Sequence, residues 1–116
     1  MVEIHSLFEM AYVGTFDDVY HIYVYANEGN IPHFHFKTTD KEEGCIRIDK
    51  PEYFNHGNKQ KTLNSGEIKE LIKLLKSTEK DTQKTYYQYL IILWNANNPN
   101  HRLSVNSKMP DYTQIV

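Results

Sequence analysis

The sequence predicts one α+β domain: a small antiparallel β-sheet of three to four strands, followed by two C-terminal helices packed on one face. Segments rich in β-branched and aromatic residues fill the first half of the 116 residues, and two helical patterns follow residue 64. This length allows a buried core without disulfides and fits a single domain over residues 1–116. The 40% hydrophobic and 13% aromatic content is typical of a folded chain.

The first predicted strand is at the N-terminus. Residues 2–10 fit strand alternation and also fit a helical stripe, and we favour the strand. Residues 19–26 form a clearer strand, because they are rich in Val, Ile and Tyr and end at the turn-forming run 27–30.

A hairpin leads into the next strand, residues 33–37, with Pro32 at its start where a missing N–H is tolerated. Residues 45–49 form a further short strand that Pro51 ends. The run Asn55-His56-Gly57-Asn58 has turn chemistry, and we expect it to lead away from the sheet.

The register of this hairpin decides what surrounds two histidines. Alternate side chains of a strand share a face, so His33 and His35 lie on one side, about 6 to 7 Å apart at the backbone. A two-residue turn would place them opposite apolar residues of the preceding strand. A slip by one residue would instead place them opposite Tyr25 and Tyr23.

The first helix has a clear N-terminus. Asn64 stands at the N-cap position, and Glu67 three residues later completes the capping-box pattern. Four apolar residues then recur at helical spacing, which gives one packing face: Ile68, Leu71, Ile72 and Leu75.

The second helix is predicted from about residue 82 to residue 97, with Asp81 as its cap. It is apolar or aromatic nearly all round, which indicates either the central packing helix or part of a dimer interface. Residues 98–116 are predicted to be irregular chain or an edge strand.

Composition narrows the classes of partner. Residues 59–84 hold seven lysines and four acidic residues, which we interpret as the solvated face of a helix. Arginine is scarce and no basic-aromatic interleaving is present, so a nucleic-acid partner is not expected.

No apolar run reaches the roughly 20 residues that cross a bilayer, and no signal-peptide pattern opens the chain, so we expect a cytoplasmic protein with no membrane partner. Cys45, the single cysteine, agrees with a reducing compartment.

The pair His33 and His35 is the strongest candidate for a metal site, and a divalent metal is the candidate cofactor. Zinc requires three or four ligands at about 2.0 to 2.3 Å, so further ligands are needed. His56 and His101 are possible sources, and the ligand set that we favour is His33, His35, His21 and Cys45. The alternative is that the two rings are partly exposed and only pack against tyrosines.

The same histidines are candidate catalytic residues. His33 and His35, with Lys37 and Arg47, could form a cationic cluster for phosphate, in which one imidazole acts as general acid or base. The sequence contains no Gly-rich phosphate loop, no Ser-His-Asp arrangement and no paired-carboxylate signature.

Four features follow one another in a recognisable order: the tyrosine-rich strand, the run Ala26-Asn27-Glu28-Gly29-Asn30, the pentapeptide Pro32-His33-Phe34-His35-Phe36 and the helical Leu93-Trp94-Asn95. Over about residues 19 to 97 this resembles a family of small bacterial proteins known as a domain of unknown function, whose hallmark is a strand, a turn and Pro-Pro-His-x-His-Val. The chain differs from that pattern: Ile31 replaces the first proline, and Phe36 replaces a small β-branched residue.

The resemblance implies no settled biochemical role. Similar proteins are often encoded near a small partner, so it implies a toxin-antitoxin-like or defence-associated module and points to His33 and His35 as its candidate residues.

Two hypotheses follow. The first, which we favour, is a non-enzymatic binding or regulatory protein that acts through an open sheet face bearing His33 and His35, or through the second helix, with a protein partner or as a homodimer. The second is a small metal-dependent or phosphate-directed hydrolase centred on the two histidines.

Overall fold

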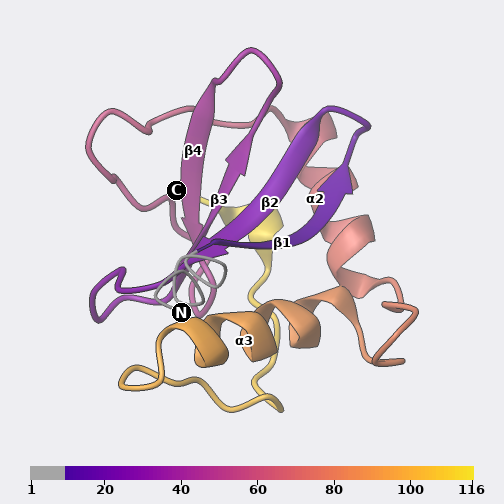
Figure 1. The fold of residues 1–116 in the computed structure, drawn as a ribbon. Helices are drawn as coiled ribbons and strands as arrows, with labels where there is room; N and C mark the ends of the chain where they lie inside the picture. The colour runs from indigo at the N-terminus through magenta and orange to yellow at the C-terminus, as the bar shows by residue number, and fades with distance from the viewer. Residues whose placement is uncertain (1–9) are drawn as a thin grey trace.

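A computed structural model of the chain describes residues 10–116 as a four-stranded antiparallel sheet followed by two helices (Figure 1). Neighbouring strands in the sheet are also consecutive in the chain: β1 (Met10–Phe16), β2 (Tyr20–Tyr25), β3 (His33–Lys37) and β4 (Glu43–Arg47). After the sheet come α2 (Ser65–Lys76), α3 (Tyr86–Asn97) and the short 3-10 helix η1 (Tyr112–Gln114). The predicted α+β fold with C-terminal helices is confirmed.

Three of the strands were expected: β3 has the predicted bounds, and the bounds of β2 and β4 are shifted. The N-terminal strand predicted over residues 2–10 lies outside the described residues except at Met10, where β1 begins. The strand expected at residues 45–49 spans Glu43–Arg47 instead, because its pairing with β3 extends back to Glu43, opposite Lys37.

The hairpin of β2 and β3 adopts the polar aromatic register. Tyr23 lies opposite His35, and His21 lies opposite Lys37. The connection is longer than a two-residue turn, and it bends at Asn27 and Gly29, which have φ values of 58° and 87°. Asparagine and glycine tolerate this left-handed conformation better than other residues.

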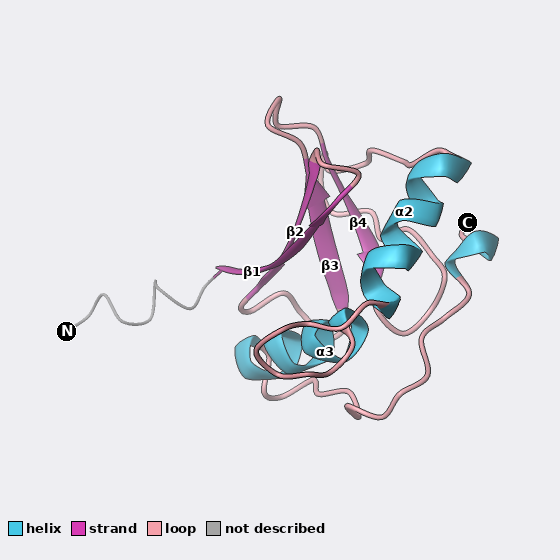
Figure 2. Ribbon diagram, turned by 90° about the vertical axis from the view of Figure 1, so that its right-hand side faces the viewer, coloured by secondary structure: helices cyan, strands magenta, loops and turns pink. Residues whose placement is uncertain are grey.

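The core lies between the sheet and the helices (Figure 2). Residues at alternate positions of β2 and β3 face the helices and are fully buried: Ile22, Val24, Phe34 and Phe36. From α3, the buried side chains are Tyr87, Leu90, Ile91 and Trp94, so this helix is a central packing element. The remaining face of β2 and β3 carries the polar and aromatic side chains.

Each of the two helices begins directly after its N-cap residue. The capping box of Asn64 and Glu67 is formed, as predicted. The second helix begins four residues later than expected, because Thr85 rather than Asp81 is its N-cap. Residues 79–83 form a turn instead, in which the Glu79 carboxylate accepts hydrogen bonds from the backbone N–H groups of Asp81 and Thr82.

The C-terminal segment is irregular apart from η1, and it packs against the domain. The indole Nε1–H of Trp94 donates to the carbonyl of His101, and the Asn95 side chain bonds both backbone groups of Leu103. Tyr112 is fully buried, and its hydroxyl donates to the carbonyl of Arg47.

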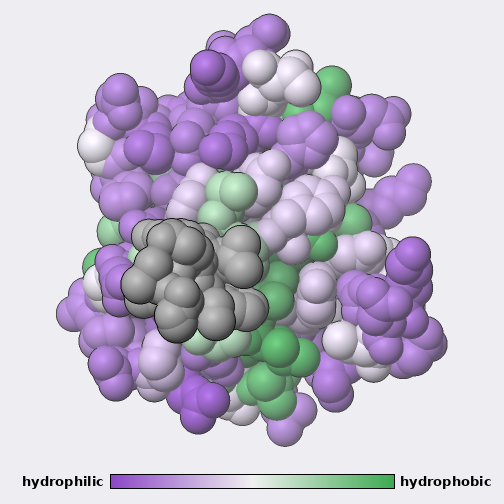
Figure 3. Space-filling model, in the orientation of Figure 1, coloured by the Kyte–Doolittle hydropathy of each residue, from purple (hydrophilic) through white to green (hydrophobic). Residues whose placement is uncertain are grey.

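Polar residues dominate the surface shown in Figure 3, and hydrophobic residues gather in the region of α3. Within residues 10–116, neither helix is long and apolar enough to span a bilayer.

Candidate metal centre

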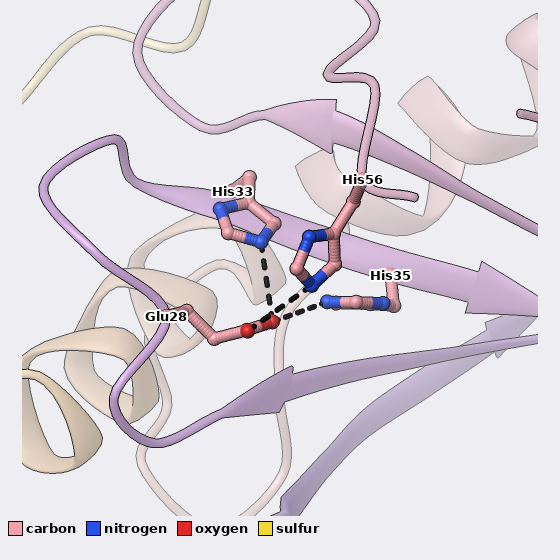
Figure 4. A group of neighbouring side chains, drawn as sticks. All are labelled: Glu28, His33, His35 and His56. Atoms are coloured by element: carbon pink, nitrogen blue, oxygen red, sulfur yellow. Dashed lines mark hydrogen bonds and ion pairs between the residues drawn. The ribbon is translucent and has the colours of Figure 1, made fainter. Parts of the chain in front are cut away.

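Four side chains from three segments converge on the polar face of the sheet (Figure 4). His33 and His35 come from β3, Glu28 from the preceding turn, and His56 from the segment after β4. One ligand atom from each lies within 4.8 Å of every other. The ring centroids of the three histidines are 5.2 to 5.4 Å apart, so the rings form a nearly equilateral triangle, and the Glu28 carboxylate contacts Nε2 of each ring.

Strand alternation places His33 and His35 together, and aromatic rings then enclose them. The Phe54 ring lies 4.4 Å from the His33 ring, and the Tyr25 ring lies 4.5 Å from the His35 ring, between centroids. Only 1% of His33 and 2% of His35 is exposed. The sheet face is therefore not open at His33 and His35, and the alternative of partly exposed rings is wrong as well. Tyr25 and Trp94, together with Phe54 and His56 from the segment after β4, cover the two rings.

That segment carries His56 over the sheet. It runs back along the edge of β4, where the N–H of Phe54 donates to the carbonyl of Cys45 and the N–H of Lys61 donates to that of Glu43. Between these anchor points, Gly57 has a φ of 65° and allows a tight turn directly after His56. The prediction that this run leads away from the sheet is wrong, since backbone pairing to β4 holds both of its ends.

The hydrogen bonds of His33 define its protonation pattern. Its Nδ1 is 2.7 Å from the carbonyl oxygen of Ile31, which can only accept, so Nδ1 carries a proton. In a neutral ring, Nε2 is then a bare acceptor. This Nε2 lies 3.2 Å from Oε1 of Glu28, which is another acceptor. A proton between the two atoms or a metal ion bound to both would make this contact favourable.

His35 presents the same pattern with shorter contacts. Its Nδ1 lies 2.6 Å from Oε2 of Glu43, and its Nε2 lies 2.6 Å from Oε1 of Glu28. A neutral imidazole supplies only one N–H, so it cannot satisfy both carboxylates. A carboxylate that fixes Nδ1–H while Nε2 points to a common centre is the usual outer support of a metal-bound histidine.

The Glu28 carboxylate is held ionised by its surroundings. Burial acts to raise its pKa, but hydrogen bonds from His33 and His35 and the positive charge of these rings outweigh burial and hold the pKa well below its usual range. His56 completes the set, with Nε2 3.2 Å from Oε2 of Glu28. A carboxylate that stays deprotonated is available as a metal ligand.

Two of the four favoured ligands, His33 and His35, belong to this cluster, and the other two do not. His21 lies on β2, where its Nδ1 is 2.9 Å from the Thr15 hydroxyl. The thiol of Cys45 is 3.4 Å from Nδ1 of His35, the nitrogen that faces away from the centre. Burial, and then the negative charges of Glu43 and Glu28, raise the pKa of this thiol to about 12, which disfavours the thiolate that a metal would need.

The two cationic residues considered for phosphate beside His33 and His35, Lys37 and Arg47, also lie outside the cluster. The ammonium of Lys37 is 3.1 Å from the Tyr25 hydroxyl and 5.0 Å from the centroid of the Tyr23 ring. Arg47 is paired with Asp49 and Glu52. The cationic groups are therefore engaged with neighbouring side chains, while the carboxylate of Glu28 contacts the histidines.

Sequence reasoning did not identify Glu28 as a site residue, and it named His56 only as one of several possible ligands. Glu28 lies between Asn27 and Gly29, two turn-forming residues, so the sequence indicated a turn at this position and not a site residue. The sequence offered two signals for these residues. Glu28 lies five residues before the first histidine of the His-x-His pair, and His56 lies in a turn that follows the next strand.

No protein-family model matches the chain, and no curated protein and no solved structure matches it.

Proposed function

We propose that this chain is a metal-dependent binding or regulatory protein, in which Glu28, His33, His35 and His56 hold one divalent transition-metal ion. The observation that carries the proposal is the hydrogen bonding of His33 and His35. Each ring has an acceptor beyond its Nδ1 and turns its Nε2 toward the same oxygen of Glu28. A single metal ion at this point satisfies both nitrogens and the carboxylate together.

The donor set fits such an ion. Imidazole nitrogens suit zinc, iron, nickel and copper, and a carboxylate oxygen adds a harder donor that zinc, iron and manganese also accept. At bond lengths of about 2.0 to 2.1 Å, tetrahedral donors lie about 3.4 Å apart. The four donor atoms here lie within 4.8 Å of one another. The Glu28 carboxylate is already 2.6 to 3.2 Å from the Nε2 atoms of the three histidines, so an ion would move the carboxylate slightly outward and draw the three rings toward it.

The number of protein ligands favours a binding role over catalysis. Four protein donors fill a tetrahedral site, whereas catalytic zinc sites retain three and leave one position open. The ion would join the turn before β3, β3 itself and the segment after β4. We infer that it fixes the surface formed by these segments, through which the protein contacts a partner.

Elemental mass spectrometry of untagged protein, with Zn²⁺ affinity measured against a chromophoric chelator, tests the proposal. The parent should bind about one metal ion per chain, and Glu28→Ala should lose most of this affinity. Glu52→Ala is the matched control, since Glu52 pairs with Arg47 outside the cluster. A parent that binds no divalent metal, or a Glu28→Ala variant that binds as tightly as the parent, would overturn the four-ligand site.

A second candidate function, a metal-dependent hydrolase, is favoured by the exposure at one side of the cluster. The His56 side chain is 38% exposed and that of Glu28 is 13% exposed, so solvent reaches the carboxylate. With three histidines as ligands, one coordination position would be open to water, and Glu28 would be placed as a general base. This alternative requires Glu28→Gln to retain the metal and to lose hydrolysis of an activated ester or phosphodiester.

The motif resemblance adds a biological context to the proposal: a bacterial, cytoplasmic, toxin-antitoxin-like or defence-associated module with a small protein partner. Co-purification with the product of a neighbouring gene, in the presence and absence of a chelator, tests this context. Release of the partner by the chelator would link partner binding to the metal ion.

A further inference from the structure

Asn98, directly after α3, connects this helix to the turn that carries Glu28. It is the C-cap residue of α3 and only 4% exposed. Its backbone N–H donates to the carbonyl of Trp94, which anchors the residue to the last turn of the helix. Its side chain is therefore fixed at the point where α3 meets the β2–β3 connection.

The amide of Asn98 binds the turn at two places. Its Nδ2 donates to the carbonyl of Tyr25, the last residue of β2, at 2.9 Å. Its Oδ1 accepts from the backbone N–H of Glu28 at 3.1 Å. The two bonds span the bend at Asn27, where the chain has a φ of 58°. One side chain thus sets the distance between the end of the strand and the backbone of Glu28.

We propose that Asn98 is a positioning residue for the metal centre, because it fixes the backbone from which the Glu28 carboxylate reaches His33, His35 and His56. This inference rests on the proposed function, since it assigns Asn98 a role in that same site. A carboxylate on a turn that is free to move would reach the common centre in only a fraction of its conformations. Residues that orient a metal ligand typically change metal affinity by about 10- to 100-fold when substituted.

Asn95 provides a matched control on the same helix. It too is an asparagine that makes two side-chain bonds to backbone, but its partner is Leu103 in the C-terminal segment. Both Asn98→Ala and Asn95→Ala remove two side-chain hydrogen bonds to the backbone, so both should lower the free energy of unfolding. Only Asn98→Ala removes a hydrogen bond to the backbone of a proposed metal ligand, Glu28.

The test is Zn²⁺ affinity by chelator competition for the parent and both variants, with urea unfolding of the metal-free proteins in parallel. Asn98→Ala should bind Zn²⁺ about 10- to 100-fold more weakly than the parent, whereas Asn95→Ala should bind within about twofold of it. Equal affinity of Asn98→Ala and the parent would overturn the inference and leave the metal site standing. A parent that binds no metal would overturn the proposed function and the inference together.

A double-substitution cycle separates positioning from general destabilisation. If Asn98 acts through Glu28, then Asn98→Ala should cause no further loss of Zn²⁺ affinity once Glu28→Ala has removed the carboxylate. An equal loss in both backgrounds would show that Asn98 acts on the fold alone and would contradict the inference. Asn98→Ser, which keeps a small hydrogen-bonding group, provides the same comparison if Asn98→Ala does not fold.

Discussion

Oε2 of Glu43 lies 2.6 Å from Nδ1 of His35, on the side of the ring opposite Glu28. Glu43 opens β4, and His35 lies in the neighbouring strand β3, so sheet pairing brings the two side chains together. The contact fixes the proton of His35 on Nδ1 and directs the lone pair of Nε2 to the centre of the cluster. The strand β4 thus supports the candidate metal centre through Glu43, which is not one of its four possible ligands.

Glu43→Gln should weaken metal binding without abolishing it. The amide still accepts a hydrogen bond from Nδ1–H but lacks the charge that increases the basicity of the ring, so we expect about a 10- to 100-fold loss of Zn²⁺ affinity. Glu42→Gln is the control, because Glu42 pairs with Lys61 instead. Unchanged affinity in both variants would show that Glu43 does not support His35.

Substitution of individual histidines should separate the ligands from the other candidates. His33→Ala and His35→Ala should each lose stoichiometric metal, since each removes one of three imidazole donors. His21→Ala and Cys45→Ser should retain it, because neither side chain belongs to the cluster. Metal content measured on the four dialysed proteins decides the matter, and loss of metal in Cys45→Ser would indicate a different ligand set.

Gly44→Ala should destabilise the fold. A Cβ at this position of β4 would lie 2.2 Å from the carbonyl oxygen of Lys61 and 2.5 Å from Cζ of Phe36, so the backbone of the covering segment would have to move. Overpacking of this kind costs about 1 to 3 kcal/mol. Urea unfolding measures the loss.

Gly66→Ala is the control for Gly44→Ala. The nearest atom that its Cβ would meet is Oδ1 of Asn64 at 3.4 Å, and the position is helical, so no loss of stability is expected. Equal stability of the two alanine variants would contradict the packing that the structure gives β4.

The free energy of unfolding should fall with rising pH between about pH 10 and pH 12, and Tyr87 should cause part of that fall. Burial, and then the charge of Asp49, raise the pKa of Tyr87 to about 12, and its hydroxyl donates to the carbonyl of Ile48. An unfolded tyrosine has a pKa of about 10. The stabilisation is therefore complete below pH 10 and is lost as pH rises through the folded-state pKa.

Tyr87→Phe tests this assignment. At neutral pH the variant should lose about 0.5 to 1.5 kcal/mol, since the carbonyl of Ile48 still accepts from the Tyr112 hydroxyl. Above pH 10 its stability should fall less steeply than that of the parent. Parallel stability curves for the two proteins would exclude Tyr87 as a contributor.

The sequence predicted those features that depend on local chemistry. The strand at His33–Lys37 and the capping box of Asn64 and Glu67 formed as expected, because alternation and capping are determined within a few residues. The start of α3 was misplaced, since Asp81 and Thr85 are both acceptable N-caps. The Glu79 carboxylate binds the turn before the helix and so excludes the earlier start.

The site was only half predictable, for a similar reason. His33 and His35 share a face through strand alternation, so their proximity could be read from two adjacent positions. Glu28 and His56 reach the same point only through the long β2–β3 connection and through the return of the chain along β4. Such non-local pairings leave no periodic pattern, and the turn residues around Glu28 and His56 resemble those of any loop.

X-ray diffraction from crystals of the protein grown with Zn²⁺, measured on both sides of the zinc absorption edge, would locate the proposed ion. We expect one anomalous peak per chain, about 2.0 to 2.2 Å from a carboxylate oxygen of Glu28 and from Nε2 of His33, His35 and His56. A peak elsewhere, or no peak with the three rings still bonded to the Glu28 carboxylate, would contradict this expectation.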